Sequence, residues 1–103
     1  MRMRILVMLK PTNLRGTKMA YTKFRKFLVS DGYILIGQEL YMRVSTNRKS
    51  AEKHIRRLSE YNPGTGTIRV LKLTEKQYGK IMYLTGEKDY QEEVVGAKCH
   101  IQL

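Results

Sequence analysis

The side chains in this chain that are best suited to chemistry are its scarce acids and its two histidines. Hydrolysis of a phosphodiester with a divalent metal needs carboxylates, because Mg²⁺ and Mn²⁺ are hard ions that take oxygen ligands. The expected first strand, residues 3–9, and the loop after it contain no carboxylate, and the nearest acids in sequence are Asp31 and Glu39. We interpret both as ordinary surface acids rather than metal ligands.

The remaining reactive residues show no pattern typical of catalysis. His54 and His100 have no cysteine or carboxylate at metal-site spacing, and neither has a serine or cysteine partner placed for nucleophilic catalysis. Gly64 and Gly66 precede an expected strand rather than a helix, so they do not form a phosphate-cradling loop. Cys99 is the single cysteine and cannot form an internal disulfide, which favours a reducing, cytoplasmic setting. The sequence therefore predicts no catalytic residues and no metal site.

Positive charge is the dominant feature of the composition. Twenty Lys and Arg residues stand against nine Asp and Glu residues, a net charge of +11, and residues 1–30 contain no acid. Such a surface attracts polyanions through counterion release, so nucleic acid is the expected partner. A membrane is not expected, because the chain has no apolar run of about 18 residues and no interfacial anchor. A basic protein with no specific ligand stays open as an alternative.

The predicted contacts are phosphate contacts, which neutralise a nucleic acid backbone without reading its bases. They are Arg15, Lys18, Lys23, Arg25, Lys26, Lys49, Lys53, Arg56 and Arg57.

A first helix from about Lys18 to Asp31 must position many of these cations. Its apolar stripe recurs at i, i+4, i+7 and i+8 and consists of Ala20, Phe24, Phe27 and Leu28. The spacing leaves Lys23 and Lys26 off the stripe and directs Arg25 to the far side. Thr17 is expected to cap the start of the helix, and Gly32 to end it in a left-handed conformation.

A second helix is predicted over residues 48–61, with an apolar stripe of Ala51, Ile55 and Leu58. The helix dipole disfavours the cations Arg48 and Lys49 at its start. Either the helix begins near Ser50, or those two side chains reach out to a phosphate.

The rest of the chain reads as strands. They are expected over residues 3–9, 33–36, 40–44 and 67–73, with a bulge or tight connection at 37–38 and a fifth strand at 81–84. A capping box over 74–77 predicts a short helix. Tyr41 could stack on a base, but no second aromatic accompanies it in the pattern of RNA-binding sheets, so we expect it to pack under a helix.

This order predicts an α+β fold, a ferredoxin-like βαββαβ sandwich with an antiparallel sheet and the helices on one face. Residues 1–103 form one domain, in which about 87–103 are an extension. That extension is expected to add a strand to a sheet edge, its own or a partner's. A second copy of the chain is the economical cover for the other face of the sheet.

Several of these segments, at their mutual spacing, resemble the CRISPR-associated protein family Cas two (Cas2), in the branch found in type II systems, which have a single large effector nuclease. They are Pro11–Thr12, Tyr21–Leu28, Asp31–Tyr33, Leu40–Arg43 and Leu73–Tyr78. The resemblance implies a homodimer in which C-terminal strands are exchanged. It further implies a role in spacer acquisition, in which the dimer bridges two dimers of the Cas one integrase while a prespacer DNA duplex lies across its basic surface. It adds Arg43 to the expected DNA contacts.

The chain departs from the resembled family at one chemically important position. That family usually ends its first strand with a Phe-Asp pair, and the aspartate is its proposed metal ligand. Counting back from Pro11, this position is Leu9, or Lys10 if the gap is placed differently, and Met8 replaces the phenylalanine. Magnesium is expected in the family, but neither Leu9 nor Lys10 can coordinate it.

Three functions follow as hypotheses. The first is a non-catalytic DNA-bridging subunit of the adaptation complex. The second is a metal-dependent endonuclease, acting on RNA or DNA, that recruits other acids. The third is a related ferredoxin-like RNA-cleaving toxin or a small ribosome-associated protein.

Overall fold

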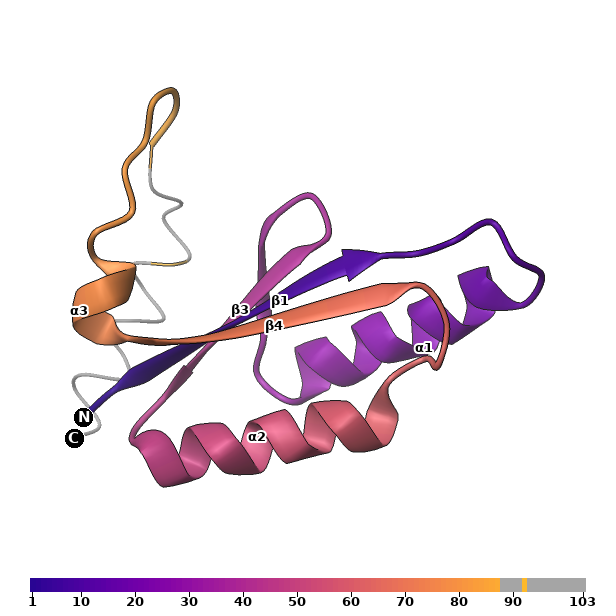
Figure 1. Ribbon diagram of the computed structural model, residues 1–103, viewed down its shortest axis with the longest axis horizontal. Helices are drawn as coiled ribbons and strands as arrows, with labels where there is room; N and C mark the ends of the chain where they lie inside the picture. The colour runs from indigo at the N-terminus through magenta and orange to yellow at the C-terminus, as the bar shows by residue number, and fades with distance from the viewer. Residues whose placement is uncertain (88–91, 93–103) are drawn as a thin grey trace.

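The computed structural model describes residues 1–87 and Glu92. The elements follow the predicted order (Figure 1): β1 (Met3–Lys10), α1 (Thr17–Ser30), β2 (Ile34–Gly37), β3 (Leu40–Ser45), α2 (Arg48–Tyr61), β4 (Thr67–Thr74) and α3 (Glu75–Tyr78). The expected exchange of a strand by the C-terminal extension concerns residues that lie largely outside this range.

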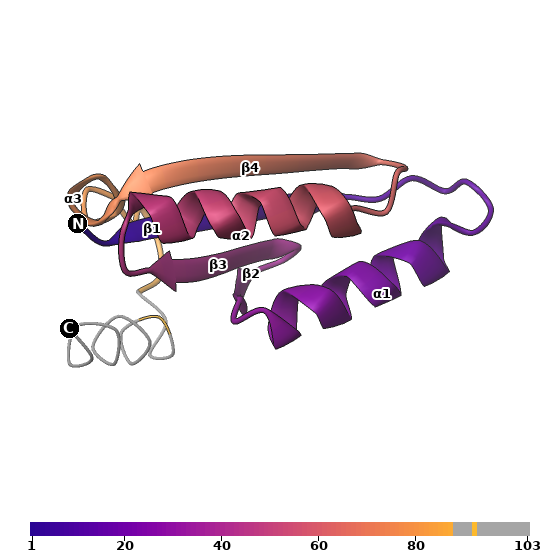
Figure 2. The same ribbon diagram turned by 90° about the horizontal axis from the view of Figure 1, so that it is seen from below.

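The four strands form one antiparallel sheet in the order β2-β3-β1-β4. This is the strand order of a ferredoxin-like fold, and it confirms the predicted class. β1 lies in the middle and pairs with β3 on one side and β4 on the other. Both long helices lie below the sheet in Figure 1, and Figure 2 shows them from beneath.

Alternation along β1 divides the core in two, because successive side chains of a strand point to opposite faces. Met3, Ile5, Val7 and Leu9 lie on the helix side, in a buried cluster with residues of α1 and α2. Tyr41 joins that cluster, so its predicted packing under a helix is confirmed. The opposite face carries a smaller cluster built around Met42, Val44 and Tyr78.

The helix α1 ends as predicted but begins differently. Gly32 has φ +93°, its N–H donates to the carbonyl of Val29 (3.1 Å), and the next N–H, of Tyr33, donates to the carbonyl of Leu28 (2.9 Å). These two bonds form a Schellman motif. The expected cap at Thr17 is wrong, because Thr17 is the first helical residue and is buried, while Gly16 precedes it without a side-chain cap.

The inner face of α1 also differs in detail from the predicted stripe. Tyr21, Phe24 and Leu28 are buried, whereas Ala20 and Phe27 are only partly buried. The Tyr21 hydroxyl donates to the carbonyl of Thr65 (2.7 Å). Tyr21 therefore takes the place of Ala20 in the buried stripe, because a tyrosine whose hydroxyl is hydrogen-bonded can be buried like a phenylalanine.

The helix α2 has the predicted bounds, so the alternative of a start near Ser50 is wrong. Asn47 is the N-cap, and its side-chain oxygen accepts a hydrogen bond from the N–H of Ser50 (2.8 Å). Asparagine is among the strongest N-cap residues, and this bond sets the helix start despite the cations Arg48 and Lys49 in its first turn.

The β2–β3 hairpin and the start of α3 also follow the prediction. The pairing of β2 with β3 shifts register between Leu35 and Gly37, just before the predicted position at 37–38, and the tight connection follows at 38–39. Both bonds of the predicted capping box, between Thr74 and Gln77, are formed. The fifth strand at 81–84 is wrong, because these residues are irregular and exposed. No helix among the described residues has the length and apolar character needed to cross a bilayer.

Candidate nucleic-acid interface

The outward sides of α1 and α2 present most of the predicted phosphate contacts to solvent. The exposed members are Arg15 in the loop before α1, Lys18, Lys23 and Lys26 on α1, and Lys49, Lys53 and Arg56 on α2. The sequence of α1 contains no acid, whereas α2 carries Glu52 and Glu60. Two neighbouring helices therefore form a cationic surface whose ammonium and guanidinium groups can donate to phosphate oxygens.

Arg25 does not point to the far side of α1 as predicted. It forms a bidentate ion pair with Glu39, the residue that precedes β3, through Nε–Oε1 (3.1 Å) and Nη2–Oε2 (2.6 Å). The hydrogen bond that Arg25 donates to Glu39 raises the pKa of Arg25 despite its partial burial. Glu39 is therefore an ion-pair partner rather than an ordinary surface acid, and Arg25 joins α1 to the β2–β3 hairpin.

Asp31 is also not an ordinary surface acid, because its side chain is only 8% exposed. One carboxylate oxygen lies 3.0 Å from Nδ1 of His54, and the other lies 3.1 Å from Nε of Arg57. Its main-chain carbonyl accepts a hydrogen bond from Arg43. The end of α1, the middle of α2 and β3 therefore meet at one residue, Asp31, and Arg43 and Arg57 have a structural role there.

His54, which has no acidic partner at metal-site spacing in the sequence, lies beside one in the fold. Burial lowers its pKa, the hydrogen bond with Asp31 opposes that shift, and the positive charges of Arg43 and Arg57 add to it. The histidine and the carboxylate therefore form a polar contact between α2 and the residue that follows α1.

The position at which the resemblance implies a metal ligand, Leu9 or Lys10, does not have the chemistry of a metal site. Leu9 is 6% exposed and belongs to the helix-side core, while its N–H donates to the carbonyl of Glu39 (2.9 Å). Lys10 is exposed and cationic. Neither side chain offers oxygen to a hard divalent ion. Across the described part of the chain, no three His, Cys, Asp or Glu side chains gather as a metal site would require.

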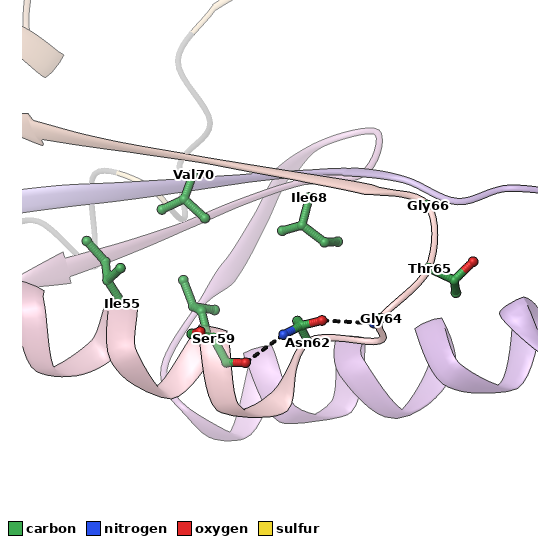
Figure 3. A pocket seen from close by; sticks show the side chains of 9 residues that line it. Ile55, Ser59, Asn62, Gly64, Thr65, Gly66, Ile68 and Val70 are labelled. Atoms are coloured by element: carbon green, nitrogen blue, oxygen red, sulfur yellow. Dashed lines mark hydrogen bonds between the residues drawn. The ribbon is translucent and has the colours of Figure 1, made fainter.

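An apolar groove of about 500 Å³ lies between α2 and β4 (Figure 3). Ile55, Leu58, Ile68 and Val70 line it, and the loop 62–66 closes one end. Asn62 shapes that loop: its Nδ2 donates to the carbonyl of Ser59 (2.6 Å) and its Oδ1 accepts from the N–H of Gly64 (2.8 Å). The residues that line the groove include no ionisable side chain, so the groove is suited to binding apolar side chains rather than to catalysis.

The opposite face of the sheet carries a buried arginine that the sequence did not mark. Arg4 is 4% exposed and forms a bidentate ion pair with Glu75 (2.9 and 2.6 Å). Its guanidinium lies 4.3 Å from the ring centroid of Tyr78, and the hydroxyl of Tyr78 donates to Glu92. This network connects β1, α3 and the described residue of the acidic extension.

The comparison with curated proteins identifies the family. The chain is 43% identical over 88 residues to the CRISPR-associated endoribonuclease Cas2 of Streptococcus mutans (strain ATCC 700610 / UA159), covering 84% of this chain and 81% of that protein. It is 40% identical over 96 residues to the protein of the same name from Acidovorax ebreus (strain TPSY), covering 92% of this chain and 94% of that one. The chain belongs to the CRISPR-associated endoribonuclease Cas2 family. The resemblance stated from the sequence is thereby confirmed, although no protein-family model matches the chain.

Within this Cas2 chain, the structure divides the ten cations named from the sequence into two groups. Arg25, Arg43 and Arg57 contact acids or carbonyls between elements, and the other seven are exposed. The sequence could not separate them, because the partners Asp31 and Glu39 are brought close only by folding. One further cation at the start of α2, Arg48, is exposed and was not among the named contacts.

Proposed function

We propose that this Cas2-family chain is a DNA-binding subunit of CRISPR adaptation that holds a duplex through its phosphates. The observation that supports this most is the set of exposed cations on α1 and α2, next to an α1 sequence without acids. Phosphate contacts of this kind position a duplex but carry no sequence information. Binding should therefore weaken steeply with salt and vary little with base sequence.

In this proposal the exposed cations contact the DNA, and the arginines that form ion pairs hold α1 and its neighbours in fixed positions. Lys18, Lys23 and Lys26 on α1 carry no ion pair to any acid in the described residues, so their charge is available to phosphate. Arg25 and Arg57 instead fix α1 against the hairpin and against α2. The interface is then rigid before DNA arrives.

We further propose that the chain acts as a homodimer that bridges integrase dimers in the cytoplasm. Three features support a second copy on the face opposite the helices. Leu71 on β4 is 46% exposed there, the apolar stretch Ile81–Leu84 is exposed after α3, and β4 is an edge strand of the sheet that the described residues form. On the helix side, the groove between α2 and β4 can also take apolar side chains of a strand added along β4.

We propose that the chain does not cut nucleic acid with a metal ion. The buried aliphatic side chain of Leu9 supports this, because the ligand expected there must be a carboxylate. The alternative is the activity that the relatives' name states, an endoribonuclease. Incubating stringently purified chain with RNA or duplex DNA, in Mg²⁺ or in chelator, decides between them. Cleavage that needs Mg²⁺ would refute the non-catalytic proposal.

The role in adaptation is tested with a Cas one integrase from the same organism. We expect the tagged chain to retain the integrase, and spacer acquisition in cells to require both proteins. Retention of ribosomes or of an antitoxin in place of the integrase would refute the bridging role and favour the third hypothesis.

A further inference from the structure

Two aromatic side chains that are far apart in sequence stack on each other between the helices. The rings of Phe27 on α1 and Tyr61, the last residue of α2, have centroids 4.2 Å apart and an interplanar angle of 13°. Phe27 is partly buried against the helix-side core, and its ring also lies 6.2 Å from that of Phe24. Tyr61, in contrast, is 54% exposed. Phe27 thus covers part of the tyrosine ring, and much of the rest is open to solvent.

The stack is held in place before any ligand binds. Phe27 is anchored by the core, and the guanidinium carbon of Arg57, one turn before Tyr61 on α2, lies 5.8 Å from the Phe27 ring centroid. Arg57 is itself fixed by its ion pair with Asp31. A flat ring whose orientation is already fixed loses little conformational entropy when a second flat group stacks on it.

The charges beside the stack are mostly positive. Lys23 lies one helical turn before Phe27 on α1, Lys26 precedes Phe27 in sequence, and both lysines are exposed. Glu60, which precedes Tyr61 in sequence, is the acid adjacent to the ring along α2. An exposed aromatic ring on a surface that also carries exposed cations is an arrangement that binds single-stranded nucleic acid, because every base has a flat face and every nucleotide a phosphate.

We propose that Tyr61 is a stacking platform for an unpaired nucleobase of single-stranded nucleic acid, with the phosphates of that strand against Lys23 and Lys26. The inference extends the proposed function, since it uses the same cationic surface. Within a duplex each base is already stacked between its neighbours, so the platform selects single strands and unpaired ends. The platform therefore favours single-stranded over duplex nucleic acid and does not distinguish one base sequence from another.

The test compares two substitutions of one residue. Tyr61→Phe keeps the aromatic ring, whereas Tyr61→Leu keeps apolar bulk against Phe27 but removes the ring. Fluorescence anisotropy measures binding of a ten-nucleotide thymidylate strand, a uridylate strand of equal length, an abasic strand with the same phosphates, and a duplex. The thymidylate and uridylate arms separate DNA from RNA as the source of the base.

We expect Tyr61→Leu to weaken binding of the thymidylate or uridylate strand roughly 5- to 150-fold, the range for stacking of one base. Tyr61→Phe should bind as the unmodified chain does, and the abasic strand and the duplex should not distinguish the three proteins. Unchanged binding of both base-carrying strands by Tyr61→Leu would overturn the inference. An equal loss on the abasic strand would overturn it too, because that loss would come from the phosphates.

A second measurement covers the case in which Tyr61→Leu does not fold. Ultraviolet cross-linking of the unmodified chain to a bromouracil-containing strand should attach the base at Tyr61, and attachment elsewhere would refute the platform. The outcome is separable from that of the proposed function. If Tyr61 is not needed but Lys23 and Lys26 still bind duplex, the inference fails alone, whereas absence of all binding at low salt refutes both.

Discussion

Neutralising two exposed lysines of α1 tests the interface with the least disturbance of the fold. Lys23 and Lys26 are exposed and unpaired with acids in the described residues, so Lys23→Gln with Lys26→Gln should leave the free energy of unfolding nearly unchanged. Arg25, which lies between them, is left intact. Its removal would also break the ion pair with Glu39 and confuse lost binding with altered structure.

The expected effect can be calculated from the number of phosphate contacts. Each contact contributes about −0.9 to the slope of log affinity against log salt, so losing two should make the slope less negative by about 1.8. Between 50 and 200 mM salt, the difference in affinity between the unmodified chain and the variant should then shrink about twelvefold. Fluorescence anisotropy with a labelled duplex at several salt concentrations measures both quantities.

A matched control separates position from net charge. Lys76→Gln with Lys80→Gln removes the same two charges from exposed residues of α3 and the segment after it. We expect this control to change the slope by much less than the α1 pair does. Equal changes in the two variants would refute a localised interface, and an unchanged slope in the α1 variant would show that these lysines do not contact DNA.

Three further outcomes test the fold and the site. Gly32→Ala should cost about 1–2 kcal/mol of unfolding free energy in denaturant titration, because Gly32 has φ +93° and an added Cβ would meet Arg43, whereas Gly79→Ala, at φ −64°, should be nearly neutral. The unfolding free energy should be highest above the ordinary histidine pKa of about 6.5 and fall as the pH drops from there through the lowered pKa of His54, and His54→Gln should flatten this part of the profile in denaturant titrations. Leu9→Asp should lower the melting temperature more than Leu9→Asn does, because the variant buries a charge; an equal or smaller fall than with Leu9→Asn would contradict this.

The order of elements could be predicted because local signals agreed with the fold. Apolar periodicity marked both long helices, Gly32 marked the end of α1, and the Thr74–Gln77 capping box marked α3. The sequence-based predictions were wrong where another interaction, or the lack of a pairing strand, outweighed a local sequence rule. The N-cap of Asn47 overcame the unfavourable cations at the start of α2, and residues 81–84 have strand propensity but no strand partner in the described chain.

The candidate site was only partly predictable, because its decisive contacts join residues distant in sequence. The pairs Arg25–Glu39 and Asp31–His54 are 14 and 23 residues apart, and each converts a group that looked free into a structural one. The Phe27–Tyr61 stack was hidden for the same reason. Spacing along one helix predicts which face a residue occupies, but not which residue of another element it meets.

The central claim is that exposed cations on α1 and α2 hold a nucleic acid duplex by its phosphates. The most direct test titrates the unmodified chain against two duplexes of equal length and unrelated sequence from low to physiological salt. We predict equal affinities for the two duplexes and a linear, steep fall of log affinity with log salt. Affinity that does not depend on salt, or that differs strongly between the two sequences, would contradict the claim.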